Sequence, residues 1–118
     1  MKRELLKAKI HKATVTETVL DYEGSLLLHY SLMKAADLIP YEKVDVYNIS
    51  NGERFSTYLI RGEKGSGAVG VYGAAARKAK VGDKLIIASY ALLDEDEIEF
   101  FMPRILILDA NNRVKEAK

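Results

Sequence analysis

Hydrophobic and polar residues alternate along much of this chain, with the two-residue period of β-strands. The alternation is clearest over residues 44–49 and 54–60, which are separated by a turn containing Asn51 and Gly52. An Asn-Gly pair favours a type I′ turn, because both residues tolerate a positive φ. We therefore predict that the two segments form an antiparallel hairpin.

Five more segments have the β-branched and aliphatic content of strands: residues 9–16, 26–28, 68–72, 84–92 and 105–108. In the first of them Ile10 and Val15 are out of phase, which indicates a bulge or a strand that changes partners. Helical patterns are confined to residues 31–39, which end before Pro40, and to a short helix after a turn at residue 73. Many short strands with few helices predict a small closed β-barrel.

Composition narrows the function classes. The chain has 118 residues, the size of one domain with a core large enough to fold unaided. Its 18 basic and 17 acidic side chains leave a net charge of +1, so no overall field attracts nucleic acid or an anionic membrane. Cysteine is absent and only His11 and His29 could supply nitrogen ligands, so disulfides, thiolate chemistry and a zinc site are not expected. Because no apolar run is long enough for a signal or a membrane span, we expect a soluble, cytoplasmic protein.

The dipeptide Gly24-Ser25 lies just before a predicted strand. Ser25 supplies a hydroxyl that could attack the carbonyl of Gly24, and a glycine does not obstruct that approach. Most Gly-Ser pairs are ordinary turns, so the dipeptide alone does not decide between a turn and a self-cleaving bond.

Two predicted strands each place reactive side chains on one face. These are Lys9 and His11 on one strand, and Arg54, Ser56 and Tyr58 on the other. A cation for a carboxylate and a phenol for proton transfer would thus project together. The same pattern is common on the solvent face of an edge strand or hairpin. Thr57 would point to the opposite face, so its contact with a ligand would need backbone groups or a local twist.

Small residues at Gly73-Ala74-Ala75-Ala76 allow two interpretations. Their backbone N–H groups could hold a carboxylate, or they could form a close-packed turn. The glycine-rich segment 62–70 lacks the Lys-Ser/Thr ending of a phosphate-binding loop, and we predict a mobile surface loop. The acidic run over residues 94–97 has no EF-hand spacing and is predicted to be a solvated turn.

Taken in order, the motifs resemble those of the pyruvoyl-dependent aspartate 1-decarboxylases, which make β-alanine for pantothenate biosynthesis. The matching motifs are Lys9-x-His11, Tyr22-Glu23-Gly24-Ser25, Asn51-Gly52-x-Arg54-Phe55-Ser56-Thr57-Tyr58, Gly73-Ala74-Ala75-Ala76 and Val81-Gly82-Asp83. Their order and spacing together are specific, although no single motif would be.

The resemblance implies one domain over residues 1–118, a six-stranded double-psi β-barrel, assembled as a homotetramer with active sites between neighbouring subunits. It implies self-cleavage between Gly24 and Ser25, giving a β chain of residues 1–24 and an α chain of residues 25–118. Cleavage would turn Ser25 into a covalent pyruvoyl group, the cofactor. A Schiff base between this group and L-aspartate would accept the electrons left when CO2 departs, and β-alanine would result.

The resemblance also implies roles for the matching residues. Arg54 would bind a substrate carboxylate with help from Lys9, and Tyr58 would reprotonate the carbon from which CO2 leaves. Thr57 would polarise the Gly24 carbonyl during self-processing. The remaining positions would hold or surround the substrate: Thr57, Gly73, Ala74 and Ala75 as binding groups, and His11, Tyr22 and Tyr72 as supporting residues.

Three positions depart from the pattern of the family. Tyr72 stands where asparagine is common, which puts the rate of self-processing in question. Tyr47 replaces a frequent tryptophan, and residues 33–37 differ where the helix of many members ends in Ala-Gly. The need for a maturation helper protein and the strictness of the preference for L-aspartate stay open.

A second function class is a non-catalytic double-psi barrel that binds a peptide or small ligand, or that serves as an assembly module. It predicts an intact chain without a reactive carbonyl. A nucleic-acid-binding barrel has less support, because basic and aromatic residues are not interleaved in a patch.

Overall fold

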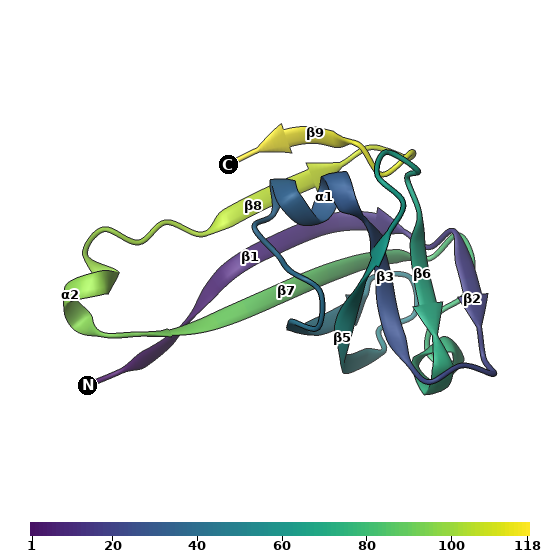
Figure 1. The fold of residues 1–118 in the computed structure, drawn as a ribbon, viewed down its shortest axis with the longest axis horizontal. Coiled ribbons are helices and arrows are strands. Elements are labelled where there is room, and N and C mark those ends of the chain that lie inside the picture. Colours follow the sequence, from purple (N-terminus) through teal and green to yellow (C-terminus); the bar gives the residue numbers. More distant parts are fainter.

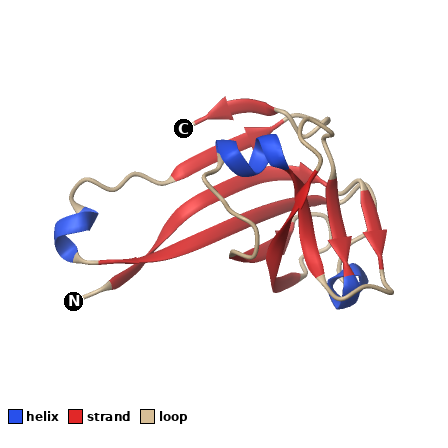
Figure 2. Cartoon of the chain, in the orientation of Figure 1, coloured by secondary structure: helices blue, strands red, loops and turns tan.

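The computed structural model describes residues 1–118 as a mainly β structure with short helical segments (Figures 1 and 2). The strands are β1 (Arg3–Thr14), β2 (Glu17–Val19), β3 (Ser25–His29), β4 (Lys43–Asn48), β5 (Arg54–Gly62), β6 (Val69–Tyr72), β7 (Lys84–Leu93), β8 (Arg104–Leu108) and β9 (Val114–Ala117). They form one hydrogen-bonded sheet in the order β2-β6-β3-β5-β4-β7-β1-β8-β9. None of the helices has the length and apolar character that crossing a membrane requires.

The expected six-stranded closed barrel is not confirmed, because the sheet has 9 strands and its order ends at β2 and β9. The sheet is nevertheless strongly curved. Only Val15 and Thr16 connect β1 to β2, although β2 lies at the opposite end of the strand order. The amide of Thr16 donates to the carbonyl of Val69 in β6 at 2.8 Å, so the two regions are in direct contact. A flat sheet would hold them several strand spacings apart.

The curvature encloses an apolar core. Inward-facing positions of five strands supply fully buried side chains, among them Ile10, Leu26, Val46, Leu59 and Ile87. The polar positions that alternate with them face outward, which confirms the strand period read from the sequence. Most of the site residues described below lie on this outer side or at the strand ends, whereas Thr57 lies on the inner face of β5.

β1 contains the predicted irregularity. Its antiparallel register with β7 shifts between His11 and Ala13, and Lys12 between them has a φ of 68°. This bulge explains why Ile10 and Val15 are out of phase in the sequence yet are both buried.

β4 and β5 form the predicted antiparallel hairpin, but the predicted type I′ turn is wrong. Only Gly52 has a positive φ, of 79°, and Asn51 does not. The Asn51 side chain instead accepts a hydrogen bond from the amide of Glu53 at 2.8 Å. The loop is thus longer than a two-residue turn, and its strand ends are joined by the amide of Asn48 donating to the carbonyl of Glu53 at 2.8 Å.

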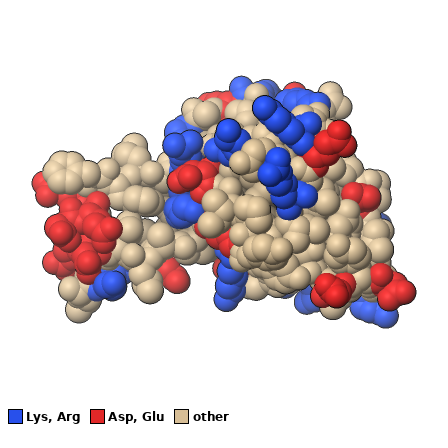
Figure 3. All heavy atoms as spheres, viewed as in Figure 1, with Lys and Arg blue, Asp and Glu red and all other residues tan.

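The helices are shorter than the sequence suggests. α1 (Tyr30–Ala35) ends well before Pro40, and the turn at Gly73 leads into η1 (Gly73–Arg77), a 3₁₀ helix. The acidic run is not a plain turn, because it forms α2 (Glu95–Ile98) with a capping box between Asp94 and Glu97. The long β1–β7 pair carries α2 away from the core, and Figure 3 shows acidic side chains gathered at that tip.

Candidate active site

Ser25 is the first residue of β3 and is completely buried, with an exposed fraction of 0%. Its Oγ atom has no hydrogen-bond partner. A buried hydroxyl left without a partner is costly, so it calls for a specific explanation. The preceding residue, Gly24, has a φ of 103°, a backbone conformation that residues with a side chain rarely adopt. The Gly24-Ser25 junction therefore combines a backbone conformation that favours glycine with a buried hydroxyl that has no partner.

Gly73 is packed directly against this junction. A β-carbon at position 73 would lie 2.5 Å from the Cα atom of Gly24 and 2.9 Å from the carbonyl oxygen of Tyr22. The φ of Gly73 is 76°, so both space and backbone conformation require glycine. The close-packed interpretation of the Gly73 turn is thus confirmed.

The next two residues of that turn, Ala74 and Ala75, lie in the five-residue η1, exposed and half-buried respectively. This 3₁₀ helix is too short to offer a helix dipole to a carboxylate. Substrate binding by their backbone groups stays a prediction.

Tyr72 pairs with Ser25 across the antiparallel β3–β6 ladder. Its ring packs against Tyr22, with ring centroids 4.8 Å apart, and its hydroxyl donates to Glu17 Oε1 at 2.6 Å. Burial and this hydrogen bond raise the pKa of Tyr72 to about 12. The hydroxyl is therefore protonated at neutral pH and already bound to Glu17, so it does not replace the amide that is common at this position in the resembled family.

Tyr58 lies next to the junction, on β5. Leu26 pairs with Leu59 in the parallel ladder between β3 and β5, so Ser25 and Tyr58, one residue earlier on each strand, lie side by side on the same face. Tyr58 is 38% exposed, which leaves its phenol accessible. Thr57 alternates to the other face and is half-buried, as the sequence predicted.

Lys9, His11 and Arg54 form a second group, on the outer face of the sheet. His11 pairs with Ile86 of β7, Ile86 pairs with Tyr47 of β4, and Tyr47 pairs with Arg54 of β5. These four residues form one lateral row across four strands. Lys9 precedes His11 by two residues on β1, so it lies on the same face. Lys9 and His11 thus share a face of the sheet with Arg54, but three strand spacings, about 14 Å, separate His11 from Arg54.

The environment of His11 favours its neutral form. Burial, followed by the positive charges of Lys9, Lys12 and Lys118, lowers the pKa of this imidazole below 6.5. Its Nδ1 atom is buried and has no partner. A neutral His11 therefore adds no positive charge to this face of the sheet.

The two groups are separated within one chain. Arg54 and Tyr58 are four residues apart on β5, a distance of about 13 Å along an extended strand. The Arg54 side chain does not reach toward Tyr58 either, because its Cζ atom lies 4.3 Å from the centroid of the Tyr47 ring. An aspartate molecule is shorter than this gap.

Two residues outside the predicted set lie against it. Glu17 holds the hydroxyl of Tyr72, and Tyr90 holds that of Tyr47, with 2.9 Å between the two oxygens. The alternation of residues 84–92 places Tyr90 on the same face as Ile86, so the sequence contained a signal for its orientation but none for its partner.

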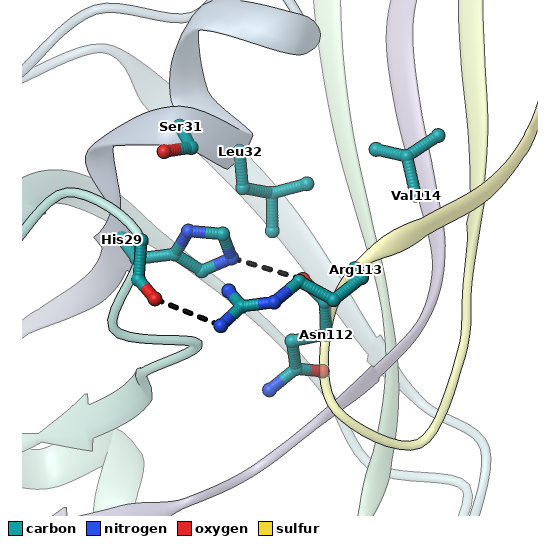
Figure 4. Close-up of a pocket in the computed structure, with 7 residues that line it drawn as sticks. His29, Ser31, Leu32, Asn112, Arg113 and Val114 are labelled. Atoms are coloured by element: carbon teal, nitrogen blue, oxygen red, sulfur yellow. Dashed lines mark hydrogen bonds between the residues drawn. The ribbon is translucent and has the colours of Figure 1, made fainter.

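A separate pocket of about 290 Å³ contains none of the predicted residues (Figure 4). Several of its polar groups hold the chain together, whereas the Nδ1 atom of His29 is buried without a partner. The Nε2 atom of His29 is 2.9 Å from the carbonyl oxygen of Asn112, and Arg113 donates to the carbonyl of Gly65 at 2.8 Å. The pocket is therefore distinct from the candidate site.

Comparison with known proteins gives a consistent picture. The family described as aspartate decarboxylase matches residues 1–115. The chain is 53% identical over 118 residues to the aspartate 1-decarboxylase of Ralstonia nicotianae, covering 100% of this chain and 98% of that protein. It is 51% identical over 115 residues to the aspartate 1-decarboxylase of Syntrophus aciditrophicus, covering 98% of this chain and 99% of that protein. With that of Methylobacillus flagellatus it shares 50% identity over 118 residues, covering 100% and 94%.

Proposed function

The chain belongs to the aspartate decarboxylase family, and on this premise we propose that it is an enzyme that cleaves itself at Gly24-Ser25 and then decarboxylates L-aspartate to β-alanine for pantothenate biosynthesis. The observation that carries the proposal is the buried, unpartnered hydroxyl of Ser25 directly after a glycine with positive φ. Nothing in the fold or the comparisons favours the non-catalytic alternative.

Self-processing uses the chain's own atoms. The Ser25 hydroxyl oxygen attacks the Gly24 carbonyl carbon, the peptide C–N bond breaks, and the hydroxyl proton passes to the released amine. Loss of the Ser25 α-proton then breaks the Cβ–Oγ bond and frees Gly24 as a carboxylate. Water releases ammonia from the remaining dehydroalanine and leaves a pyruvoyl group at position 25. An unpartnered hydroxyl supports the first step, because no competing hydrogen bond has to break.

The residues present fit this group. The buried position of Ser25, enclosed by Tyr58 on β5 and Tyr72 on β6, would hold a small neutral ketone away from water. The group would supply a carbonyl that takes up the electrons left by departing CO2. We assign Thr57, Gly73, Ala74 and Ala75 to binding the substrate's polar groups, and Tyr22 and Tyr72 to walling the site.

The charged side chains would orient the substrate, and a tyrosine would transfer a proton. Arg54 offers a planar guanidinium for a carboxylate, and Lys9 adds a second cation beside the neutral His11. Tyr58, next to Ser25 and open to solvent, is placed to donate a proton to the carbon that loses CO2. These roles are the ones that the resemblance to the family implies.

We further propose a homotetramer whose sites lie between neighbouring subunits, with Ser25 and Tyr58 from one subunit and Arg54 from its neighbour. The distance along β5 supports this arrangement, since one chain holds Arg54 and Tyr58 too far apart for a single aspartate. Exposed apolar side chains near α2, at the end of the β1–β7 pair, also support assembly. They are Leu92, Phe100 and Met102, with exposed fractions of 63%, 83% and 81%.

We also propose that the fold contains the double-psi β-barrel that the family resemblance implies. We assign it to six adjacent strands, in the order β6-β3-β5-β4-β7-β1. The contact between Thr16, just after β1, and Val69 of β6 supports this assignment, because it joins the two ends of that order.

Intact-mass measurement with an activity assay tests the function. We expect purified protein to consist of two fragments divided at position 24/25, and to form β-alanine and CO2 from L-aspartate. Ser25→Ala should stay a single chain and form no β-alanine, whereas Ser31→Ala, a half-buried serine elsewhere, should behave as wild type. Fully cleaved protein that yields no β-alanine would refute the decarboxylase, and a chain that never cleaves would refute self-processing.

A further inference from the structure

The guanidinium of Arg54 does not stand free on the sheet. Its Cζ atom lies 4.3 Å from the centroid of the Tyr47 ring, and the two residues pair directly across the β4–β5 ladder. A guanidinium is attracted to the electron-rich face of an aromatic ring. The Tyr47 ring therefore sets the position of the group that is proposed to take a substrate carboxylate.

Tyr47 is in turn held by a residue from another strand. Its hydroxyl oxygen is 2.9 Å from the hydroxyl oxygen of Tyr90 in β7, and the two are hydrogen bonded. This hydrogen bond, together with burial, raises the pKa of Tyr90 to about 12. The Tyr90 phenol thus keeps its proton across the neutral range, and the link between β4 and β7 persists there.

We propose that Tyr90 is a positioning residue for aspartate binding, which fixes the Tyr47 ring through the hydroxyl pair and the Arg54 guanidinium through that ring. The proposal rests on the proposed role of Arg54 as the carboxylate-binding group. A guanidinium already held in place loses less freedom when it binds a carboxylate than one that rotates freely. Loss of the support should therefore weaken substrate binding and leave the chemical step unchanged.

Removing single hydroxyl groups tests the chain of contacts in processed enzyme. Tyr90→Phe should raise KM for L-aspartate about fivefold, the value of one ordinary hydrogen bond, and change kcat by less than about twofold. Tyr47→Phe keeps the ring and should have the same effect. The double variant should show no larger effect, because both single changes break the same bond. An unchanged KM, a loss confined to kcat, or additive effects would overturn the proposal.

A matched control exists elsewhere in the chain. Arg61 lies over the Tyr30 ring, with its Cζ atom 3.9 Å from the centroid, and this pair is not part of the proposed site. Tyr30→Phe should leave KM and kcat as in the wild type. A rise in KM equal to that of Tyr90→Phe would show a general effect of losing a tyrosine hydroxyl and would overturn the specific role.

A second readout needs neither cleavage nor turnover. In the Ser25→Ala precursor, protons of the Arg54 side chain should show upfield NMR shifts caused by the Tyr47 ring. Tyr90→Phe in this background should move them toward the values of an unstructured arginine, and unchanged shifts would contradict the positioning role. Failure of the proposed function would look different, because wild-type protein would then form no β-alanine while these shifts still responded to Tyr90→Phe.

Discussion

A β-carbon added at Gly73 would lie 2.5 Å from the Cα atom of Gly24, so the turn before η1 is packed against the residue whose carbonyl is proposed to be attacked. A side chain at position 73 could therefore not be accommodated without moving the backbone of Gly24. Gly24 has a φ of 103°, and Gly73 lies 49 residues further along the chain. We therefore expect self-cleavage to be sensitive to substitution of Gly73.

Gly73→Ala should therefore block or severely slow cleavage and destabilise the precursor by at least about 3 kcal/mol, from the clash together with backbone strain. Gly65→Ala is the matched control, because Gly65 has a φ of 74° and nothing within 4 Å of its added β-carbon. It should cost about 1 kcal/mol and leave cleavage intact. Mass spectrometry and urea unfolding measure both effects. Normal cleavage in Gly73→Ala would show that the packing at Gly24 does not matter.

Tyr72 should limit the rate of self-cleavage, because its hydroxyl is already bound to Glu17 and cannot donate to the oxygen that develops charge at Gly24. Tyr72→Asn supplies a free amide donor on the same face as Ser25, and we expect faster conversion to two fragments in time-resolved mass spectrometry. Tyr72→Phe should cleave at the wild-type rate and lose about 1 kcal/mol of stability with the Glu17 bond. Slower cleavage in both variants would indicate that the phenol takes part.

Glu42 should make stability depend on pH in the acid range. Burial acts to raise the pKa of this carboxyl, but hydrogen bonds from Lys7, Ser89 and the amide of Ile39, with the charge of Lys7, outweigh burial and lower it below 4.5. A lowered folded pKa means that the carboxylate stabilises the protein above the unfolded pKa. That contribution is lost as the pH falls through the folded pKa.

Urea unfolding of the Ser25→Ala precursor between pH 7 and pH 3 measures this. Glu42→Gln should cost about 2 kcal/mol at pH 7, and the difference from the parent should shrink below about pH 4.5. Glu63→Gln, at an exposed loop position, is the control and should follow the parent at every pH. A difference that stays constant with pH would show that the charge of Glu42 does not contribute.

The sequence predicted the elements whose pattern is local. β4 and β5 follow from their alternation, and β7 follows from its apolar content. The bulge in β1 follows from the phase of Ile10 and Val15, because core burial must be maintained on both sides of it. β2 and β9 were missed because almost all of their side chains are exposed, so no alternation marks them. Their strand state depends on hydrogen bonds to distant neighbours, β6 and β8.

The candidate site was predicted residue by residue from motifs, and its division into two groups was not. That division depends on strand order, which places Ser25 beside Tyr58 and Tyr72, and His11 in the row that ends at Arg54. Pairings between segments far apart in sequence leave no periodic signal within either segment. The bond between Tyr47 and Tyr90 was missed for the same reason.

The two-group arrangement predicts that two inactive variants can restore each other. Ser25→Ala cannot form the pyruvoyl group, and Arg54→Ala is expected to cleave normally but bind aspartate poorly, so each alone should form almost no β-alanine. When the two are co-expressed and assemble at random, a site is complete if its Ser25 comes from the Arg54→Ala subunit and its Arg54 comes from the Ser25→Ala subunit. Each condition holds for half of the subunits, so about a quarter of the sites should be active.

Co-expression of Ser25→Ala with the double variant Ser25→Ala/Arg54→Ala is the control and should stay inactive, because no subunit then cleaves. The β-alanine formed per assembled tetramer, with the subunit ratio checked by mass spectrometry, measures the result. Activity no greater than that of the separate variants would place Ser25 and Arg54 of each working site in the same chain. Since Arg54 and Tyr58 are held about 13 Å apart on β5 in one chain, recovery to about a quarter is the outcome that we expect.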